Sequence, residues 1–129
     1  MARYLLDSDA IIDHLRRRAD SVRLIEGLFE QGESLCSCDV VVSEVYAGIR
    51  PEDQVRAEEL VERLEYLTTS RAAAVRAGQW RYAYARRGIA LPVYDALIAA
   101  VAYSAGATIV TGNIRDYPMP EVSLLPLPR

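Results

Sequence analysis

The class of fold is decided by a stretch almost at the N-terminus, Arg3-Tyr4-Leu5-Leu6-Asp7-Ser8-Asp9-Ala10-Ile11-Ile12-Asp13. Its Tyr4-Leu5-Leu6 run is short, apolar and bounded by polar residues, which predicts a buried strand. Ser8 is a suitable N-cap for the helix that follows, which we expect from Ala10 to Arg18. Asp7 would then stand at the carboxyl end of a strand, where open α/β sheets bind their ligands. Taken alone, Asp7 can equally be a capping residue, so its interpretation depends on the other carboxylates.

Strand-like and helix-like patterns alternate along the rest of the chain. Short apolar runs predict strands at 34–37, 107–110 and 122–125. Helical periodicity predicts helices at 21–31, 39–48 (with Asp39 as its cap), 52–67, 72–87 and 94–103. This alternation is typical of an α/β fold, a three-layer α/β/α sandwich with a mainly parallel central sheet. The 129 residues are expected to form a single domain, 1–129.

The composition excludes several classes of enzyme. All 15 basic residues are arginine and none is lysine, which excludes P-loop nucleotide binding and Schiff-base chemistry. The lack of lysine also counts against receiver domains and haloacid-dehalogenase-type phosphatases. His14 is the only histidine, so no zinc site with several histidines can form. Carboxylates remain, and these ligands suit Mg²⁺ and Mn²⁺.

Hydropathy and cysteine usage indicate a cytoplasmic protein with no membrane partner. No apolar run approaches the roughly 18 residues that a membrane span needs. Cys36 and Cys38 are expected to be small buried hydrophobic residues in a reducing compartment, rather than a redox pair or a metal clip. No motif supports the remaining alternative, a nucleophilic cysteine activated by His14.

Three further carboxylates are expected at the same edge of the sheet as Asp7. Glu44 lies among valines in the third predicted helix, Asp95 is in the first turn of the last one, and Asp116 follows the strand at 107–110. Helices that follow a parallel strand, and helices that lead into one, both begin near the carboxyl ends of the strands. Each residue also has a structural alternative: a solvated Glu44, an N-capping Asp95 and an Asx-turn Asp116. The coincidence of four favours one shared site.

Such a cluster favours metal-dependent hydrolysis. Like charges held together raise one another's pKa values unless a cation neutralises them. Mg²⁺ is a suitable cation, because it binds through a few carboxylates plus water. The ion lowers the pKa of a bound water, orients a phosphodiester and stabilises the charge on the leaving oxygen.

Four segments resemble the PIN-domain family, and in particular its small VapC-type toxin ribonucleases. They are Leu5-Leu6-Asp7-Ser8-Asp9, Val42-Ser43-Glu44-Val45-Tyr46-Ala47-Gly48, Pro92-Val93-Tyr94-Asp95-Ala96-Leu97-Ile98-Ala99-Ala100 and Thr111-Gly112-Asn113-Ile114-Arg115-Asp116-Tyr117. The resemblance implies a Mg²⁺-dependent endoribonuclease, with Mn²⁺ able to substitute, that is the toxin of a type II toxin–antitoxin system. It also implies a homodimer, an RNA substrate and a cognate VapB-type antitoxin.

The resemblance assigns roles to individual residues. It implies that Asp7, Glu44, Asp95 and Asp116 are the catalytic and metal-binding quartet, with the hydroxyl of Ser8 beside the first. Asn113 is an alternative to Asp116 as the fourth site residue. The sequence departs from the family at Asp9, where asparagine is common, and at Cys38 and Val41, where hydroxyl residues are common before the central glutamate.

RNA contacts are expected from local arginines, because the net charge is −3. The candidates are Arg16, Arg17, Arg18, Arg86 and Arg87, although the first three can also simply end a helix. Two alternative functions remain: a PIN nuclease in RNA processing or on DNA without an antitoxin, and a catalytically silent PIN-like binding module.

Overall fold

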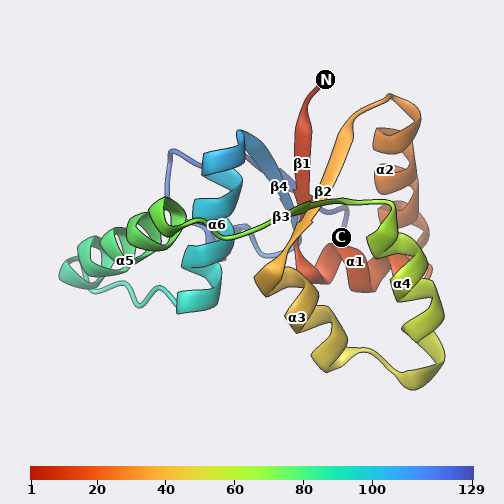
Figure 1. Cartoon of the computed structure of the whole chain (residues 1–129), viewed down its shortest axis with the longest axis horizontal. Coiled ribbons are helices and arrows are strands. Elements are labelled where there is room, and N and C mark those ends of the chain that lie inside the picture. Colours follow the sequence, from red (N-terminus) through yellow and green to blue (C-terminus); the bar gives the residue numbers. More distant parts are fainter.

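A wholly parallel five-stranded sheet forms the centre of the molecule, and the computed structural model describes all residues from Met1 to Arg129. The strand order is β3-β2-β1-β4-β5 (Figure 1). The strands are β1 (Arg3–Leu6), β2 (Ser34–Cys38), β3 (Glu65–Leu67), β4 (Ala107–Thr111) and β5 (Leu124–Pro126). β1 therefore lies between β2 and β4, and Leu5 pairs with Cys36 on one side and Ile109 on the other.

Six helices cover the sheet. They are α1 (Ser8–Leu15), α2 (Ala19–Glu30), α3 (Asp39–Gly48), α4 (Gln54–Glu62), α5 (Arg71–Arg86) and α6 (Val93–Ala105), with 3-10 turns η1 (Pro51–Asp53) and η2 (Ile114–Asp116). α2 and α4 lie on one side of the sheet, α5 and α6 on the other, and α3 touches both α1 and α6 (Figure 1). The predicted three-layer α/β/α class is confirmed. No helix is long and apolar enough to cross a membrane.

Buried apolar residues come from most elements of the fold, and β1, the start of α1 and α6 are prominent among them. Leu5 and Leu6 of β1 are fully buried, and so are Ala10 and Ile11 at the start of α1. Nearly every residue of α6 from Asp95 to Ala102 is buried, because this helix lies between the sheet and α5. The two cysteines are free and buried, as predicted.

The start and end of the first helix differ from the prediction. Asp7, not Ser8, is the N-cap, because its carboxylate accepts a hydrogen bond of 2.8 Å from the main-chain N–H of Ser8. The helix ends at Leu15 rather than at Arg18. Arg17 takes a left-handed backbone with φ 58° and Arg18 becomes the N-cap of α2, so the arginine run forms the tight turn between the helices.

The predicted helix at 52–67 is confirmed only over α4, Gln54–Glu62, and its two ends are wrong. A 3-10 turn covers Pro51–Asp53, and residues from Glu65 form the edge strand β3 against β2. Val55 near the start of α4 is 68% exposed. Leu64 and Leu67 fit a helical period but also flank or lie in a strand, and main-chain pairing with β2 decides between these patterns.

Asp39 attaches this edge strand to the rest of the sheet instead of capping α3. Its carboxylate accepts hydrogen bonds from the hydroxyl of Tyr66 and, at 3.2 Å, from the main-chain N–H of Thr69. The N-cap of α3 is Cys38. The hydrogen bond from Tyr66 is the main cause of a lowered pKa at Asp39, and burial works against it.

We predict that Asp39→Ala lowers the free energy of unfolding by about 1 kcal/mol, because a charged acceptor loses two donors. The folded-state pKa is depressed, so this stabilisation is present above the unfolded pKa near 3.8 and is lost as the pH falls through the folded value. Chemical denaturation of both proteins at pH 7 and pH 3 measures the difference. Glu59→Ala, an exposed carboxylate of α4, is the control. Equal stabilities at pH 7 would contradict this role for Asp39.

Candidate functional site

The four predicted carboxylates lie at the carboxyl edge of the sheet. Asp7 directly follows β1, Glu44 is on the helix after β2, Asp95 is in the first turn of α6, and Asp116 ends the turn after β4. Their charges act on one another: Asp7 raises the pKa of Glu44, and Asp116, Asp7 and Glu44 all raise that of Asp95. The fold therefore brings the quartet together.

Burial and repulsion change the chemistry of these groups. Asp95 is only 8% exposed, and burial followed by the charge of Asp116 raises its pKa to about 7. Burial also raises the pKa of Glu44, which is half-buried, while a hydrogen bond from the Ser8 hydroxyl lowers it. At neutral pH the structure therefore holds a carboxyl group that can both bind and release a proton.

Asp7 is fixed by a donor on each of its oxygens. The hydroxyl of Tyr117 donates to Oδ2 at 2.7 Å, and the main-chain N–H of Ser8 donates to Oδ1 at 2.8 Å. Burial, followed by the charge of Asp7, raises the pKa of the Tyr117 hydroxyl far above its usual range. Tyr117 therefore stays protonated and keeps the Asp7 carboxylate in one orientation.

Asp9 holds the loop that carries Asn113. Its Oδ2 accepts hydrogen bonds from the main-chain N–H of Gly112 at 2.8 Å and from Nδ2 of Asn113 at 3.2 Å. Its Oδ1 is buried and has no hydrogen-bond partner. Burial, followed by the nearby charge of Asp7, raises the pKa of Asp9. Asp9 thus adds a fifth carboxylate to the site and positions Asn113 beside it.

The guanidinium of Arg129 lies next to this cluster, close to the carboxylates of Asp9 and Asp13. Its Nη2 lies 3.6 Å from Oδ2 of Asp9 and 3.5 Å from Oδ2 of Asp13. The guanidinium presses on Gly112, where a Cβ would come within 2.5 Å of Nε. A larger residue at this position would make the guanidinium of Arg129 move.

The predicted RNA-contacting arginines do not touch the quartet. The guanidinium of Arg18 is 3.9 Å from Oδ1 of Asp13, and that of Arg87 lies over the ring of Tyr84 at 5.0 Å. Arg16 and Arg17 are in the α1–α2 turn, exposed. Their role in RNA binding stays a prediction.

The donor set suits a hard divalent cation. No three of the aspartate, glutamate, histidine and cysteine side chains are arranged to enclose an ion. Mg²⁺ usually binds through one or two carboxylates and keeps several waters, so a closed cage is not required. The unpartnered Oδ1 of Asp9 and the mutual repulsion at Asp95 are the features that a cation would relieve. The residues therefore fit the predicted ion.

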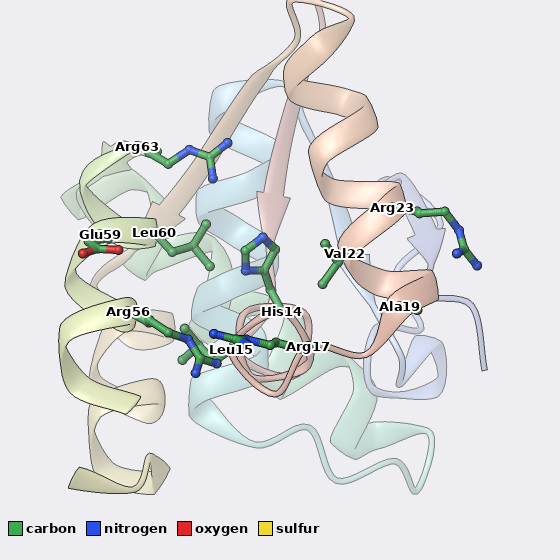
Figure 2. A pocket seen from close by; sticks show the side chains of 10 residues that line it. All are labelled: His14, Leu15, Arg17, Ala19, Val22, Arg23, Arg56, Glu59, Leu60 and Arg63. Atoms are coloured by element: carbon green, nitrogen blue, oxygen red, sulfur yellow. The ribbon is translucent and has the colours of Figure 1, made fainter. Parts of the chain in front are cut away.

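A cavity of about 650 Å³ opens between α1, α2 and α4, as Figure 2 shows. Its apolar floor is formed by Leu15, Val22 and Leu60. Four arginines stand around it, Arg17, Arg23, Arg56 and Arg63, with a single acidic residue, Glu59. Arg23, Arg56 and Arg63 are each paired with a carboxylate outside the lining. The groove is therefore apolar at its centre, and Arg17 is its one arginine without an ion pair.

An ion pair between Glu26 and Arg63 lies at the edge of the groove. The carboxylate of Glu26 accepts two hydrogen bonds from Arg63, at 2.8 and 3.0 Å, and lies 2.8 Å from Nε2 of His14. The hydrogen bonds from Arg63 are the largest cause of a lowered pKa at Glu26, about 2. These contacts join α2 to α1 and to the end of α4.

Comparison with known proteins places the chain in a family. Residues 4–119 match the sequence model of the PIN domain. The chain therefore belongs to the PIN domain family, and the resemblance seen in the four segments is confirmed.

Its relatives include nucleases of the VapC type. The tRNA(fMet)-specific endonuclease VapC of Shigella flexneri is 33% identical over 122 residues, covering 91% of each chain. Ribonuclease VapC19 of Mycobacterium tuberculosis is 30% identical over 117 residues, covering 89% of this chain and 92% of the relative.

Solved structures have the same fold over nearly the whole chain. DNA-bound VapBC from Salmonella typhimurium matches with a TM-score of 0.82 and 27% identity, covering 98% of both chains. VapBC2 from Rickettsia felis, bound to a promoter DNA fragment, matches with a TM-score of 0.86. Its 22% identity and its coverage of 98% and 99% show the shared fold.

Sequence reasoning missed Tyr117 and Arg129. Tyr117 directly follows Asp116 in one of the quoted segments, but its spacing from Asp7 gives no sign of the hydrogen bond between them. Arg129 is separated from Asp9 by almost the whole chain, and only the closing strand β5 brings it there.

We predict that Asp95→Asn stabilises the metal-free protein at high pH. The folded-state pKa is raised, so the stability of the wild type is complete below the unfolded pKa near 3.8 and declines as the pH rises through about 7. In EDTA at pH 8 the variant should be more stable by about 1–3 kcal/mol, and near pH 4 the two proteins should be equal.

Thermal unfolding across this pH range tests the prediction. Asp53→Asn is the matched control, because Asp53 is equally buried but lies 3.0 Å from Nε of Arg50 and 3.7 Å from Nη1 of Arg56. This variant should be less stable than the wild type at pH 8, because it weakens the pairing with both arginines. A pH-independent difference between Asp95→Asn and the wild type would contradict the assigned repulsion.

Proposed function

We propose that this protein is a divalent-metal-dependent endoribonuclease, the toxin of a type II toxin–antitoxin pair, acting through one PIN domain that spans residues 1–129. The observation that carries the proposal is the group of four mutually repelling carboxylates at one edge of the sheet. VapC ribonucleases that align along most of the chain support the substrate class.

In the proposed mechanism, Asp7, Glu44, Asp95 and Asp116 would hold Mg²⁺ or, in its place, Mn²⁺. When bound, the ion would supply a water of lowered pKa and would neutralise the charge that develops on the leaving oxygen. Tyr117 and the N–H of Ser8 keep Asp7 oriented toward the site. Without the ion, burial and the charge of Asp116 raise the pKa of Asp95 to about 7, so an ion held there would displace its proton near neutral pH.

Several neighbouring groups orient the RNA in this proposal. Ser8 and Asn113 lie beside Glu44 and Asp9 respectively, where a hydroxyl and an amide can donate to a phosphate. Two relatives are tRNA(fMet)-specific endonucleases, from Salmonella typhimurium and Shigella flexneri, so tRNA(fMet) is the first substrate to test.

We predict that Asp7→Asn and Asp95→Asn each reduce RNA cleavage at least about a hundredfold while the fold is retained, because each removes a proposed metal ligand. EDTA should abolish cleavage by the wild type, and Mn²⁺ should restore it. Gel assays with tRNA(fMet), total RNA and single-stranded DNA give the rates and the substrate class. Asp20→Asn, a surface carboxylate paired with Arg23, is the control.

The outcomes separate the alternatives. Cleavage that survives EDTA and both substitutions would contradict the metal site. Cleavage of DNA only, or RNA cleavage without growth arrest and without a neighbouring antitoxin gene, would favour a processing nuclease. The absence of any cleavage by a folded, metal-loaded wild type would favour a silent binding module.

We also propose a homodimer that a VapB-type antitoxin inhibits through two contacts. A guanidinium from the antitoxin tail would bind the carboxylate quartet, because planar donors pair with carboxylates in bidentate geometry. The rest of the tail would lie in the groove between α1, α2 and α4 (Figure 2). The apolar side chains of Leu15, Val22 and Leu60 in this groove support the arrangement, because such a tail can pack against them.

We predict that the antitoxin tail and the metal compete, because both neutralise the same carboxylates. Calorimetric titration of a synthetic tail peptide should give a weaker affinity in several millimolar Mg²⁺ or Mn²⁺ than in EDTA. Replacing the tail arginine by alanine should remove most of this metal dependence. If neither the metal nor the replacement of the tail arginine changes the affinity, inhibition acts elsewhere, by blocking the path of the RNA.

A further inference from the structure

A second, smaller cavity opens directly beside the carboxylates, on the opposite side of the site from the antitoxin groove. Its volume is about 250 Å³. We name it the Tyr94 pocket after its exposed aromatic residue. The connection between α5 and α6 and the turn after β4 form its walls, with Leu91, Pro92, Tyr94, Arg115 and Pro118 around the opening. Asp95 and Asp116 of the quartet also line it.

Two hydrogen bonds from α5 keep the walls of the Tyr94 pocket in place. Nε of Arg81 donates to the main-chain carbonyl of Leu91 at 3.0 Å, and the hydroxyl of Tyr84 donates to the carbonyl of Pro118 at 3.2 Å. The guanidinium of Arg87 packs over the ring of the same tyrosine. The pocket is therefore preformed, since one helix holds both of its sides.

Tyr94 and Arg115, both exposed at the pocket, have no side-chain partner inside the protein. Tyr94 is 47% exposed and makes no hydrogen bond. Arg115 is exposed and takes part in no ion pair, hydrogen bond or aromatic contact. Most arginines of this chain are engaged by carboxylates, carbonyls or rings, and only a few are free: Arg16, Arg17, Arg71 and Arg115. Arg115 alone among these lines a cavity shared with the quartet.

The shape and charge of the pocket select its ligand. A volume of 250 Å³ is below the range of sites for whole drug-sized molecules and suits one planar ring system. Asp95 and Asp116 repel an anion from the interior, so the phosphate stays at the mouth beside Arg115 and the group that enters carries no negative charge. The lining is mixed, with apolar Leu91, Pro92 and Pro118 beside charged groups. An exposed aromatic ring next to polar groups is typical of sites that stack an unpaired base and hydrogen-bond its edge.

We propose that the Tyr94 pocket binds one unpaired nucleobase next to the scissile phosphodiester, with the base stacked on Tyr94 and its phosphate paired with Arg115. The inference rests on the proposed nuclease function and adds the specificity subsite. It requires that the RNA be single-stranded at the cleavage position, because a base within a duplex cannot leave the helix to enter the pocket without losing its stacking.

Binding measurements test the pocket without relying on cleavage. The probes are fluorescent oligoadenylate, oligouridylate and an abasic ribose-phosphate oligomer of the same length, in an Asp7→Asn background. Adding Tyr94→Ala should weaken binding of a base-carrying oligomer about fivefold or more and leave the abasic affinity unchanged. Tyr94→Phe should retain full affinity. Tyr82→Ala, at an exposed tyrosine of α5 outside the pocket, is the control and should change neither affinity.

Kinetics on an RNA that the wild type cleaves provide the second test. Tyr94→Ala should raise KM with little change in kcat. Arg115→Ala should reduce the slope of log affinity against log salt concentration by about one unit, the value for one lost phosphate contact. Arg71→Ala, the control, should leave that slope unchanged. Unchanged KM and unchanged affinity in Tyr94→Ala, or equal losses on abasic and base-carrying oligomers, would overturn the pocket and leave the nuclease proposal standing. A base-dependent loss of binding by a protein that cleaves no RNA would overturn the nuclease proposal alone.

Discussion

Repulsion among carboxylates held at one edge of a parallel sheet is the constraint on which the rest of this structure depends. The central position of β1 places Asp7 between the helix that carries Glu44 and the strand that leads to Asp116. Burial of α6 then forces Asp95 into the same volume and raises its pKa to about 7. Hydrogen bonds to Asp7, Asp9 and Glu44 and the ion pair between Arg129 and Asp9 offset part of this repulsion locally. The remaining compensation must come from protons or from a cation.

The distribution of arginine follows from the same constraint. The chain has a net charge of −3 and no lysine, so its fifteen arginines supply every long cationic side chain. Structural pairs use many of them: Arg63 with Glu26, Arg50 and Arg56 with Asp53, and Arg3 with Glu65. Along α5, arginines instead pack on tyrosine and tryptophan rings or on a carbonyl, which makes this helix a brace for the loops beside the site. Few arginines are left without a partner to bind RNA. Each of these therefore strongly influences where a phosphate can bind.

Much of the fold, and the identity of the clustered carboxylates, could be predicted from the sequence, because burial leaves periodic patterns. The run at Tyr4–Leu6 and the apolar helix before Gly106 are set by local hydrophobicity, and topology then brings Asp7 and Asp95 together. β3 was missed, because its three residues also fit the helical period and only pairing with β2 makes them a strand. The contact of Tyr117 with Asp7 and that of Arg129 with Asp9 were missed as well. Long-range polar contacts of this kind leave no local pattern and depend on exact side-chain geometry.

The most direct test of the central claim is the proton balance of metal binding. If a divalent cation relieves the repulsion, Mn²⁺ must displace the proton that the raised pKa of Asp95 retains. Calorimetric titration of Mn²⁺ in buffers with different heats of ionisation gives the number of protons released. We expect close to one proton near pH 6 and far less near pH 8, with the release near pH 6 lost in Asp95→Asn. No binding of Mn²⁺, or binding without proton release near pH 6, would contradict the account.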